Sequence, residues 1–332
     1  LRIFANVARA VLFSSLVFEL FAGITQQKIA PLVFDRIPGA SGAPYYWSEA
    51  NIFNGDRIQG IVANANTLAA IAMVGVILFA VEHMIFGVAR WLSWVSLFSA
   101  IATIALTKSA GIGFALITVI LAAIVSFAAE GKDRETRHRY YRLAWTGSAI
   151  VLFFMLVYRN EVFTFIGKSP DMTGRSGIWK NVLALVAEKP IQGWGWVSYW
   201  IPGIKPFEGL GVVNGVEYYQ AHNAYIEMFF QLGAIGLALL IALLFVAFVK
   251  IWRLAVRHTN ALYLWPILLF VGLLAQNLTE SRMLVEIGWV YIVLLTVKVN
   301  EPIDSLEPIG RSTKRVKLVP KQLRKFVFKP KE

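Results

Sequence analysis

The chain has 332 residues, of which 57% are hydrophobic and only 16% are charged. A soluble domain of this size carries about 25% charged residues, so the composition excludes a water-soluble globule and requires lipid to solvate much of the surface. We attribute the net charge of +12 at pH 7 to Lys and Arg on cytoplasmic loops rather than to nucleic-acid binding, and the absence of cysteine excludes disulfides and thiol nucleophiles.

Predominantly apolar runs follow one another along the chain. They cover residues 10–26, 61–81, 91–107, 109–129, 143–158, 228–249, 259–279 and 283–297, and the sixth extends back to residue 224. A helix that crosses the hydrocarbon core needs about 20 such residues. We therefore predict an all-α polytopic membrane protein with about eight transmembrane helices and one long extracytoplasmic loop.

Three basic segments set the predicted orientation. They are residues 130–142, residues 250–258 and the tail after residue 300, and alternation along the chain puts all of them on one side. Because Lys and Arg collect on cytoplasmic loops, this side is cytoplasmic. We predict a transmembrane domain over residues 1–299, containing the extracytoplasmic loop 159–222, and a basic cytoplasmic tail over residues 300–332. Residues 27–60, the turn at Lys108 and the turn at 280–282 are also extracytoplasmic.

His222 is the one histidine on the predicted outer face, at the mouth of the sixth span. A lone interfacial histidine is more often structural than catalytic, but the neighbours of His222 are polar or ionisable. Helical spacing would put Tyr225 one turn away, and Asn223 is adjacent. Glu227 falls just inside the apolar run, where an ionisable group is costly and has a role or a partner.

Two arginines share the predicted outer face with this histidine. Arg57 lies just ahead of the second span, and Arg175 lies at the start of a predicted surface helix over residues 176–188, which Pro190 terminates. A helix N-terminus beside a guanidinium is a favourable phosphate site. The alternative is an arginine that is merely solvated or that contacts lipid head groups.

The stretch after that helix, PIQGWGWVSYW, is rich in tryptophan. An aromatic belt at the membrane surface would explain Trp194 and Trp196. Stacking on sugar rings or contact with an isoprenoid chain would explain them equally well. We leave the two interpretations open.

The outer loops contain no Asp-x-Asp, no His/Asp cluster with metal spacing, no Gly-x-Ser-x-Gly and no Walker loop. The sequence therefore gives no support to metal-dependent, serine-nucleophile or NTP-driven chemistry, and we expect no cofactor. One imidazole, two arginines and aromatic side chains remain. This set suits a transferase whose substrate carries a phosphate leaving group.

Four short motifs occur in order along the chain. Arg-x-x-Gly followed by Asn occupies Arg57, Gly60 and Asn66. Gly-Arg-x-x-x-Trp, then Pro and Gly-x-Gly, occupies Gly174, Arg175, Trp179, Pro190, Gly193 and Gly195. His-Asn with a later Gly occupies His222, Asn223 and Gly233, and a polar pair before the last span occupies Glu280 and Ser281. Together, from about residue 55 to residue 297, the chain resembles the O-antigen ligase and polysaccharide polymerase superfamily.

The resemblance implies a GT-C-like glycosyltransferase of the bacterial inner membrane, with its active face outside, that uses undecaprenyl-diphosphate-linked glycans. Arg57 and Arg175 would hold the diphosphate, and His222 would take the proton from the acceptor hydroxyl, with inversion and without a metal. The expected acceptor-binding or supporting residues are Asn223, Tyr225, Glu227, Trp194, Trp196 and Glu280. Members of this family usually have more spans, so we expect a short variant or a chain that lacks its first spans.

The acceptor is either another lipid-linked repeat, in a polymerase, or a lipid core, in a ligase, and we favour the polymerase. Other polysaccharide-assembly proteins and membrane lipids are expected partners, and nucleic acid is not. One rival interpretation is a transporter or lipid-linked glycan flippase, which would need charges facing a central cavity, such as Glu19, Glu227 and Glu286. A second is a non-catalytic scaffold for envelope assembly.

The predicted topology can be tested directly because the chain has no cysteine. Single cysteines introduced at Lys108, Gly209 and Ser281 should react with an impermeant reagent in intact cells. Cysteines at Arg137 and Lys317 should react only after permeabilisation, because alternation puts them in the cytoplasm. Labelling of a cysteine at position 137 in intact cells would show that the orientation is the opposite of the predicted one. The candidate residues would then lie on the cytoplasmic face.

Overall fold

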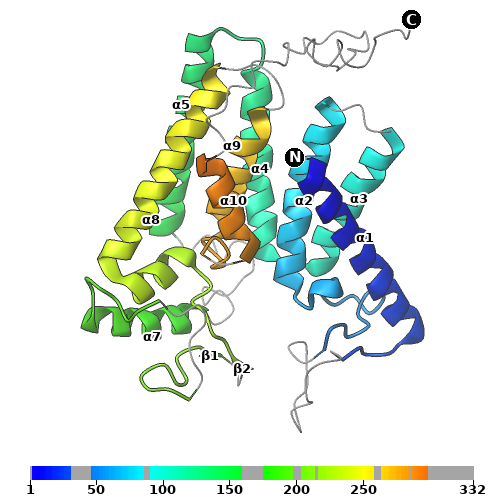
Figure 1. The fold of residues 1–332 in the computed structure, drawn as a ribbon, viewed down its shortest axis with the longest axis vertical. Coiled ribbons are helices and arrows are strands. Elements are labelled where there is room, and N and C mark those ends of the chain that lie inside the picture. The colour runs from blue at the N-terminus through cyan, green and yellow to red at the C-terminus, as the bar shows by residue number, and fades with distance from the viewer. Residues whose placement is uncertain are drawn as a thin grey trace, which may run out of the picture. The chain divides into compact units, whose positions relative to one another are not determined.

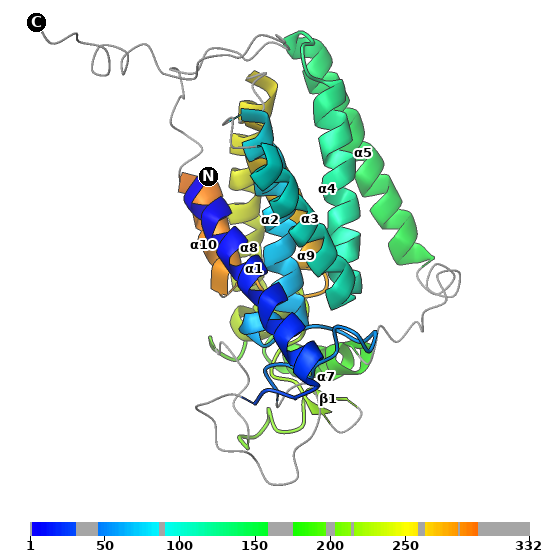
Figure 2. The same ribbon diagram turned by 90° about the vertical axis from the view of Figure 1, so that its right-hand side faces the viewer.

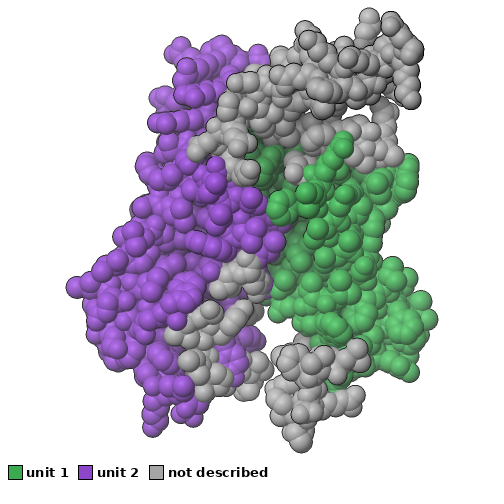
Figure 3. Space-filling model, viewed as in Figure 1, with its two compact units in different colours: residues 1–117, 259–269, 301–332 green, residues 118–258, 270–300 purple. Residues whose placement is uncertain are grey.

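The computed structural model describes residues 2–30, 46–85, 90–158, 175–196, 203–213, 216–257, 263–284 and 286–297, and most of these are helical (Figure 1). The strands among them are the short antiparallel pair β1, Val212–Val213, and β2, Val216–Glu217. The predicted all-α class is therefore confirmed. The chain divides into two compact units, residues 1–117, 259–269 and 301–332, and residues 118–258 and 270–300 (Figure 3).

The first unit is built on three helices that pack along one another: α1, Arg2–Thr25, α2, Ala65–Ile85, and α3, Arg90–Thr107 (Figure 2). A short 3₁₀ turn, η2, Gly60–Val62, precedes α2. Small residues let the backbones approach closely, and Ala69 and Ala72 on α2 are fully buried. Arg9 on α1 pairs with Glu82 on α2 at 2.6 Å and donates to Ser96 on α3 at 2.7 Å, so a polar contact also ties the three helices together.

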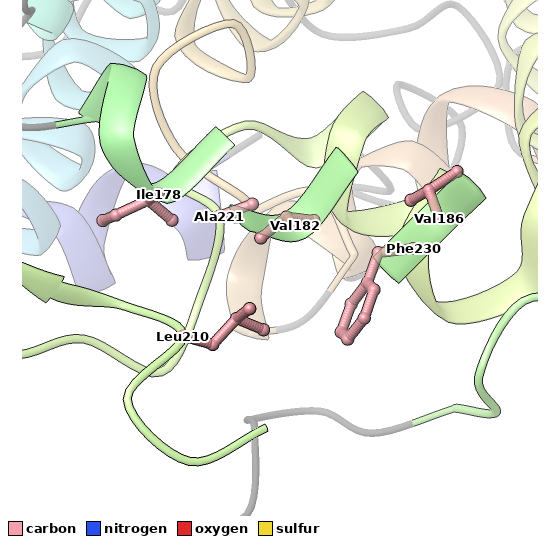
Figure 4. Packing of buried hydrophobic residues seen from close by; sticks show 6 residues of the cluster. All are labelled: Ile178, Val182, Val186, Leu210, Ala221 and Phe230. Carbon is pink, nitrogen blue, oxygen red and sulfur yellow. The ribbon is translucent and has the colours of Figure 1, made fainter. Parts of the chain in front are cut away.

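The second unit contains α5, Arg134–Val157, α7, Arg175–Glu188, α8, Ala224–Arg257, and α10, Glu286–Val297. Helices α4, Ala110–Ala128, and α9, Leu264–Gln276, each have residues in both units. Figure 1 shows α7 lying crosswise near the start of α8. A buried cluster joins α7 to the start of α8 and the intervening loop (Figure 4); its members are Ile178, Val182, Val186, Leu210, Ala221 and Phe230.

A helix coincides with every predicted apolar run, and α7 coincides with the predicted surface helix. Among the described residues, 4 helices are long and apolar enough to cross a membrane: Arg2–Thr25, Ala65–Met84, Ala110–Ala128 and Ala224–Arg257. Trp91–Thr107, Leu264–Gln276 and Ile287–Val297 are apolar but shorter. The count of about eight spans and the loop topology therefore stay predictions. The basic tail 300–332, Gly174 and much of the loop 159–222 lie outside the described residues.

Helix α8 is not the single continuous span that the sequence predicts, because it breaks at Gly233, where φ is 61° and ψ is −162°. The segment after α7 bonds the backbone groups that the break releases. The N–H groups of Trp194 and Gly195 donate to the carbonyls of residues 230 and 231, and those of residues 234 and 235 donate to the carbonyls of Pro190 and Ile191. In apolar surroundings a break of this kind persists only where such partners exist.

Two glycines make this contact possible. A Cβ on Gly233 would lie 2.1 Å from the carbonyl oxygen of Ile191, and a Cβ on Gly193 would lie 2.5 Å from that of Gln231. Both glycines also have positive φ, of 61° and 70°. The Pro-x-x-Gly-x-Gly stretch and the glycine that follows His-Asn in the sequence are therefore two halves of one backbone-to-backbone contact.

The Gly233→Ala variant should be markedly destabilised. The backbone of Gly233, with φ of 61° and ψ of −162°, is adopted almost only by glycine. Alanine would pay roughly 1–3 kcal/mol there, and the clash with Ile191 adds to this cost. Thermal unfolding of the detergent-purified protein measures the effect. Gly177→Ala on α7, where a Cβ meets no atom within 4 Å, is the matched control and should be close to neutral. Equal midpoints for the two variants would contradict the proposed contact.

Candidate active site

The start of α8 positions His222. Asn223 is the N-cap of the helix, because its Oδ1 accepts hydrogen bonds from the backbone N–H groups of Tyr225 at 3.0 Å and Ile226 at 3.1 Å. His222 precedes this cap with a φ of 50°. Non-glycine residues adopt this left-handed region uncommonly, so the neighbours of His222 have to hold it there.

Hydrogen bonds fix the backbone on both sides of His222. The N–H of Ala221 donates to Glu227 Oε2 at 2.5 Å, and its carbonyl accepts from Trp179 Nε1 of α7 at 2.7 Å. On the other side, the N–H of the first helical residue donates to the carbonyl of Asn277 at 3.0 Å. Strained backbone that is held by its surroundings in this way is concentrated at functional sites.

Glu280 brings two of the predicted site residues together. Its Oε1 accepts a hydrogen bond from Arg175 Nη2 at 3.1 Å, and its Oε2 lies 3.2 Å from His222 Nδ1. The three side chains are 6%, 19% and 11% exposed, in the order Glu280, Arg175 and His222, so water screens their charges weakly. Residues 175, 222 and 280, which lie far apart in the sequence, therefore form one buried charge network.

The charges around Glu280 keep it ionised. Burial raises the pKa of this carboxyl, but the hydrogen bond from His222 and the charges of His222, Arg175 and Arg282 outweigh burial and hold the pKa below its ordinary value. A carboxylate only accepts hydrogen bonds, so His222 Nδ1 carries the proton in this contact. Whenever the imidazole is neutral, Nε2 is then the ring nitrogen that presents a lone pair, which is the arrangement that a general base needs.

Tyr218 provides a tyrosine ring that contacts His222. The helix begins after His222, so the one-turn argument for Tyr225 does not apply. The ring of Tyr218 packs edge-on against the imidazole, with centroids 5.3 Å apart. Tyr225 instead contributes a backbone N–H to the N-cap.

Sequence reasoning missed Arg282, which is 7% exposed and contributes positive charge to Glu280. A basic residue in a predicted outer turn, where Lys and Arg are uncommon, was the available signal. Two further buried polar atoms in this region, Ser281 Oγ and Gln276 Nε2, have no hydrogen-bond partner. Buried polar atoms are nearly always bonded, so these two mark where a ligand would gain contacts.

Comparison with known proteins identifies the family. The family model described as O-antigen ligase matches residues 60–241, more than half of the chain. The chain belongs to the O-antigen ligase family. Among curated proteins, it is similar to the exopolysaccharide production protein ExoQ of Rhizobium meliloti (strain 1021), with 32% identity over 85 residues. That alignment covers 25% of this chain and 20% of ExoQ. No solved structure matches the chain.

Membership of the O-antigen ligase family, together with the apolar helices, makes this a multi-pass membrane protein. The matched residues include Arg175, His222 and the glycines of the α8 break. Arg57 and Glu280 lie outside the matched range. The contact between Glu280 and His222 therefore comes from the fold of this chain and not from the match.

The two predicted tryptophans of this O-antigen ligase family member differ in their surroundings. Trp194 packs against the α7 cluster and donates a hydrogen bond from Nε1 to the carbonyl of Leu185 at 2.8 Å. Lys189 Nζ lies over its ring, 3.9 Å from the centroid. These contacts favour a structural role. Trp196 is 49% exposed, and its assignment to a sugar or a lipid stays a prediction.

Arg57 belongs to the first unit, where Nε donates to the carbonyl of Thr107 at 2.8 Å and Nη2 to Asn66 Oδ1 at 2.5 Å. Glu19 on α1 fixes the segment that carries this arginine. Its Oε1 accepts from the N–H groups of Gln59 at 2.9 Å and Gly60 at 2.6 Å. Arg57, Gly60 and Asn66, which the sequence groups as a motif, are thus neighbours in space, and the role of Arg57 on a diphosphate stays a prediction.

The acidic residues that a transporter would need have other partners. The carboxylate of Glu19 is 1% exposed and binds backbone amides, as described above. Glu227 binds the N–H of Ala221 and accepts from Gln231 Nε2 at 2.7 Å. The side chain of Glu286 lies outside the described residues. Glu19 and Glu227 therefore support local backbone structure in this fold.

The site contributes one imidazole, one carboxylate and guanidinium groups. Guanidinium groups only donate hydrogen bonds and cannot ligate a cation. Among the residues that the structure describes, no group of three or more His, Asp or Glu side chains is placed to hold a metal ion.

Proposed function

We propose that this protein transfers a glycan from an undecaprenyl-diphosphate-linked donor to a growing surface polysaccharide or to a lipid-core acceptor, without a metal and with inversion. The observation that supports it best is the buried network of Arg175, Glu280 and His222. Such a network supplies both a base oriented by a carboxylate and a cation for a phosphate leaving group. Family membership supports glycan transfer in polysaccharide assembly.

His222 is the proposed base. In the transfer step, the acceptor hydroxyl oxygen forms a bond to the anomeric carbon, and the bond from that carbon to the diphosphate oxygen breaks. The electron pair of the broken bond leaves with the diphosphate, and the hydroxyl proton passes to His222 Nε2. Glu280 stabilises the imidazolium that results, because it remains ionised beside Nδ1.

Arg175 is the proposed diphosphate ligand. It is the first residue of α7, so the amide groups and dipole of the helix N-terminus favour an anion at the same place. Nη2 bonds Glu280, and in the described residues Arg175 makes no other side-chain hydrogen bond. Arg282 adds a further positive charge near Glu280, and Arg57 remains a predicted second ligand.

The acceptor distinguishes a polymerase from a ligase, and we favour the polymerase. Gel profiles of surface glycan from a deletion strain separate the two. A polymerase deletion loses the ladder and keeps single repeats. A ligase deletion loses all glycan that is attached to the lipid core.

Replacing Arg175 by lysine should remove most activity while the protein still inserts into the membrane. An ammonium group is a point charge and does not reproduce two parallel guanidinium–phosphate hydrogen bonds. Transfer of a labelled lipid-linked glycan by purified protein is the measurement. Arg253→Lys, at an exposed arginine near the other end of α8, is the matched control. If the lysine variant is as active as the wild type while the alanine variant is inactive, a positive charge at position 175 is sufficient and the guanidinium geometry is not required.

His222→Ala should lower transfer by roughly 10²–10⁴-fold, the usual scale for a positioned proton acceptor. His222→Gln should be nearly as inactive, because an amide keeps one hydrogen bond but takes no proton. Donor affinity should change little, because arginine holds the diphosphate. Turnover and donor affinity are measured together in nanodiscs, and chelators should not affect the wild type.

His83→Gln, at a histidine of the first unit, is the control for this experiment and should behave like the wild type. Near-normal turnover of His222→Gln would remove the base role. A parallel fall in rate and donor affinity would place His222 at the diphosphate. Unchanged polymer output in cells that carry His222→Ala would support the scaffold interpretation.

A further inference from the structure

A second buried cation lies in the second unit, in the basic segment at the start of α5. Arg137 is 7% exposed, and its Nε and Nη1 atoms are buried without a hydrogen-bond partner. Among the described residues, it forms no ion pair with a carboxylate. A buried, uncompensated guanidinium costs several kcal/mol, so its presence requires an explanation.

The surroundings of Arg137 come from both α5 and the last turns of α8. Tyr141, one turn further along α5, is 4% exposed and packs against Trp252 of α8, with ring centroids 5.9 Å apart. His138 packs edge-on against the same indole at 5.3 Å, and its buried Nδ1 also lacks a partner. The adjacent residues Arg137 and His138 therefore both have buried nitrogens without a hydrogen-bond partner, next to the rings of Tyr141 and Trp252.

The acidic residues of this segment do not neutralise the charge of Arg137. Asp133 caps α5, where its Oδ2 accepts from the N–H of Thr136 at 3.0 Å. Glu135 is exposed, and Glu130 is half-buried in the preceding turn. Neither forms an ion pair with Arg137 in the described structure.

Apart from Glu135, the charged side chains of α5 and of the last turns of α8 are positive. The exposed side chains are Arg134, Arg139 and Arg142 on α5 and Arg253 and Arg257 on α8. The local field therefore attracts an anion and repels a cation. A guanidinium fork matches the oxygens of a phosphate group, and Trp and Tyr are typical of the head-group level of a membrane.

We propose that Arg137, with His138 and the wall formed by Tyr141 and Trp252, binds a phosphate-bearing anion at this end of α5, with an anionic phospholipid head group as the occupant. The anion supplies the missing hydrogen bonds and the counter-charge for Arg137. The exposed arginines increase its local concentration. Free phosphate shares the same chemistry and is the alternative source. This site is independent of the proposed glycan transfer, because it uses none of the residues at the start of α8.

The test compares the protein in nanodiscs of phosphatidylcholine alone and of phosphatidylcholine with phosphatidylglycerol. Thermal unfolding midpoints and the lipid retained in native mass spectrometry are measured for the wild type, Arg137→Gln and Arg139→Gln. Arg139→Gln is the matched control, because it removes the same charge from an exposed position two residues away. A third set of samples adds inorganic phosphate or pyrophosphate to phosphatidylcholine nanodiscs.

We expect the anionic lipid to raise the midpoint of the wild type and of Arg139→Gln but not that of Arg137→Gln. In phosphatidylcholine alone, Arg137→Gln should be as stable as the wild type or more stable, because it lacks the buried charge. Arg137→Lys, which keeps the charge and loses the fork, should bind the lipid at least about tenfold more weakly. If Arg137→Gln does not fold, the comparison of Arg137→Lys with the wild type across the same nanodiscs still tests the proposal.

The other outcomes are equally informative. A phosphate-dependent rise that requires Arg137, without an effect of phosphatidylglycerol, would support the site and make free phosphate its source. An identical rise in the wild type and Arg137→Gln would overturn the proposal. So would a wild-type protein that neither anion stabilises and that retains no anionic lipid.

Discussion

The region around His222 depends on how the backbone groups released by the break in α8 are hydrogen-bonded. A helix that breaks in apolar surroundings exposes carbonyl and amide groups that must find partners. Here the partners are the backbone groups that follow α7, and the two segments approach so closely that Gly193 and Gly233 meet without side chains. The break therefore attaches α7 and the start of α8 to each other and fixes the direction of the short helical segment that follows His222.

That attachment explains how a strained histidine can be part of a stable site. The backbone at His222 is held from α7 through Trp179, from α8 through Glu227, and from the end of α9 through Asn277. The Glu280 carboxylate then connects the imidazole to the N-terminus of α7. A network of this kind positions charges without reorganisation, which is the property that transition-state stabilisation requires.

Much of this fold follows from local sequence pattern. Long apolar runs become helices because nothing else satisfies their backbone, and a helix begins at Arg175 where the sequence predicts one. The pairing of Arg175 and His222 in one site was also predictable, because the sequence predicts the same face of the membrane for both. Three features of the site were not predictable. They are the position of Glu280 between Arg175 and His222, the charge that Arg282 contributes, and the contact of His222 with the ring of Tyr218. Glu280 contacts Arg175 across 105 residues of chain, and the contacts of Arg282 and Tyr218 depend on how the irregular segments beside the helices fold. Periodicity reports neither.

The buried contacts of α1 have a consequence for how the protein enters the membrane. A charged side chain within an inserting helix is costly unless it is paired, and α1 carries both Arg9 and Glu19. The partners of both residues, Glu82 for Arg9 and Ser48 and residues 59–60 for Glu19, are synthesised later. Although α1 is long and apolar enough to cross a membrane, it would do so alone with both charged side chains unpaired. Its insertion is energetically coupled to that of α2, so the two helices form a single unit of biogenesis.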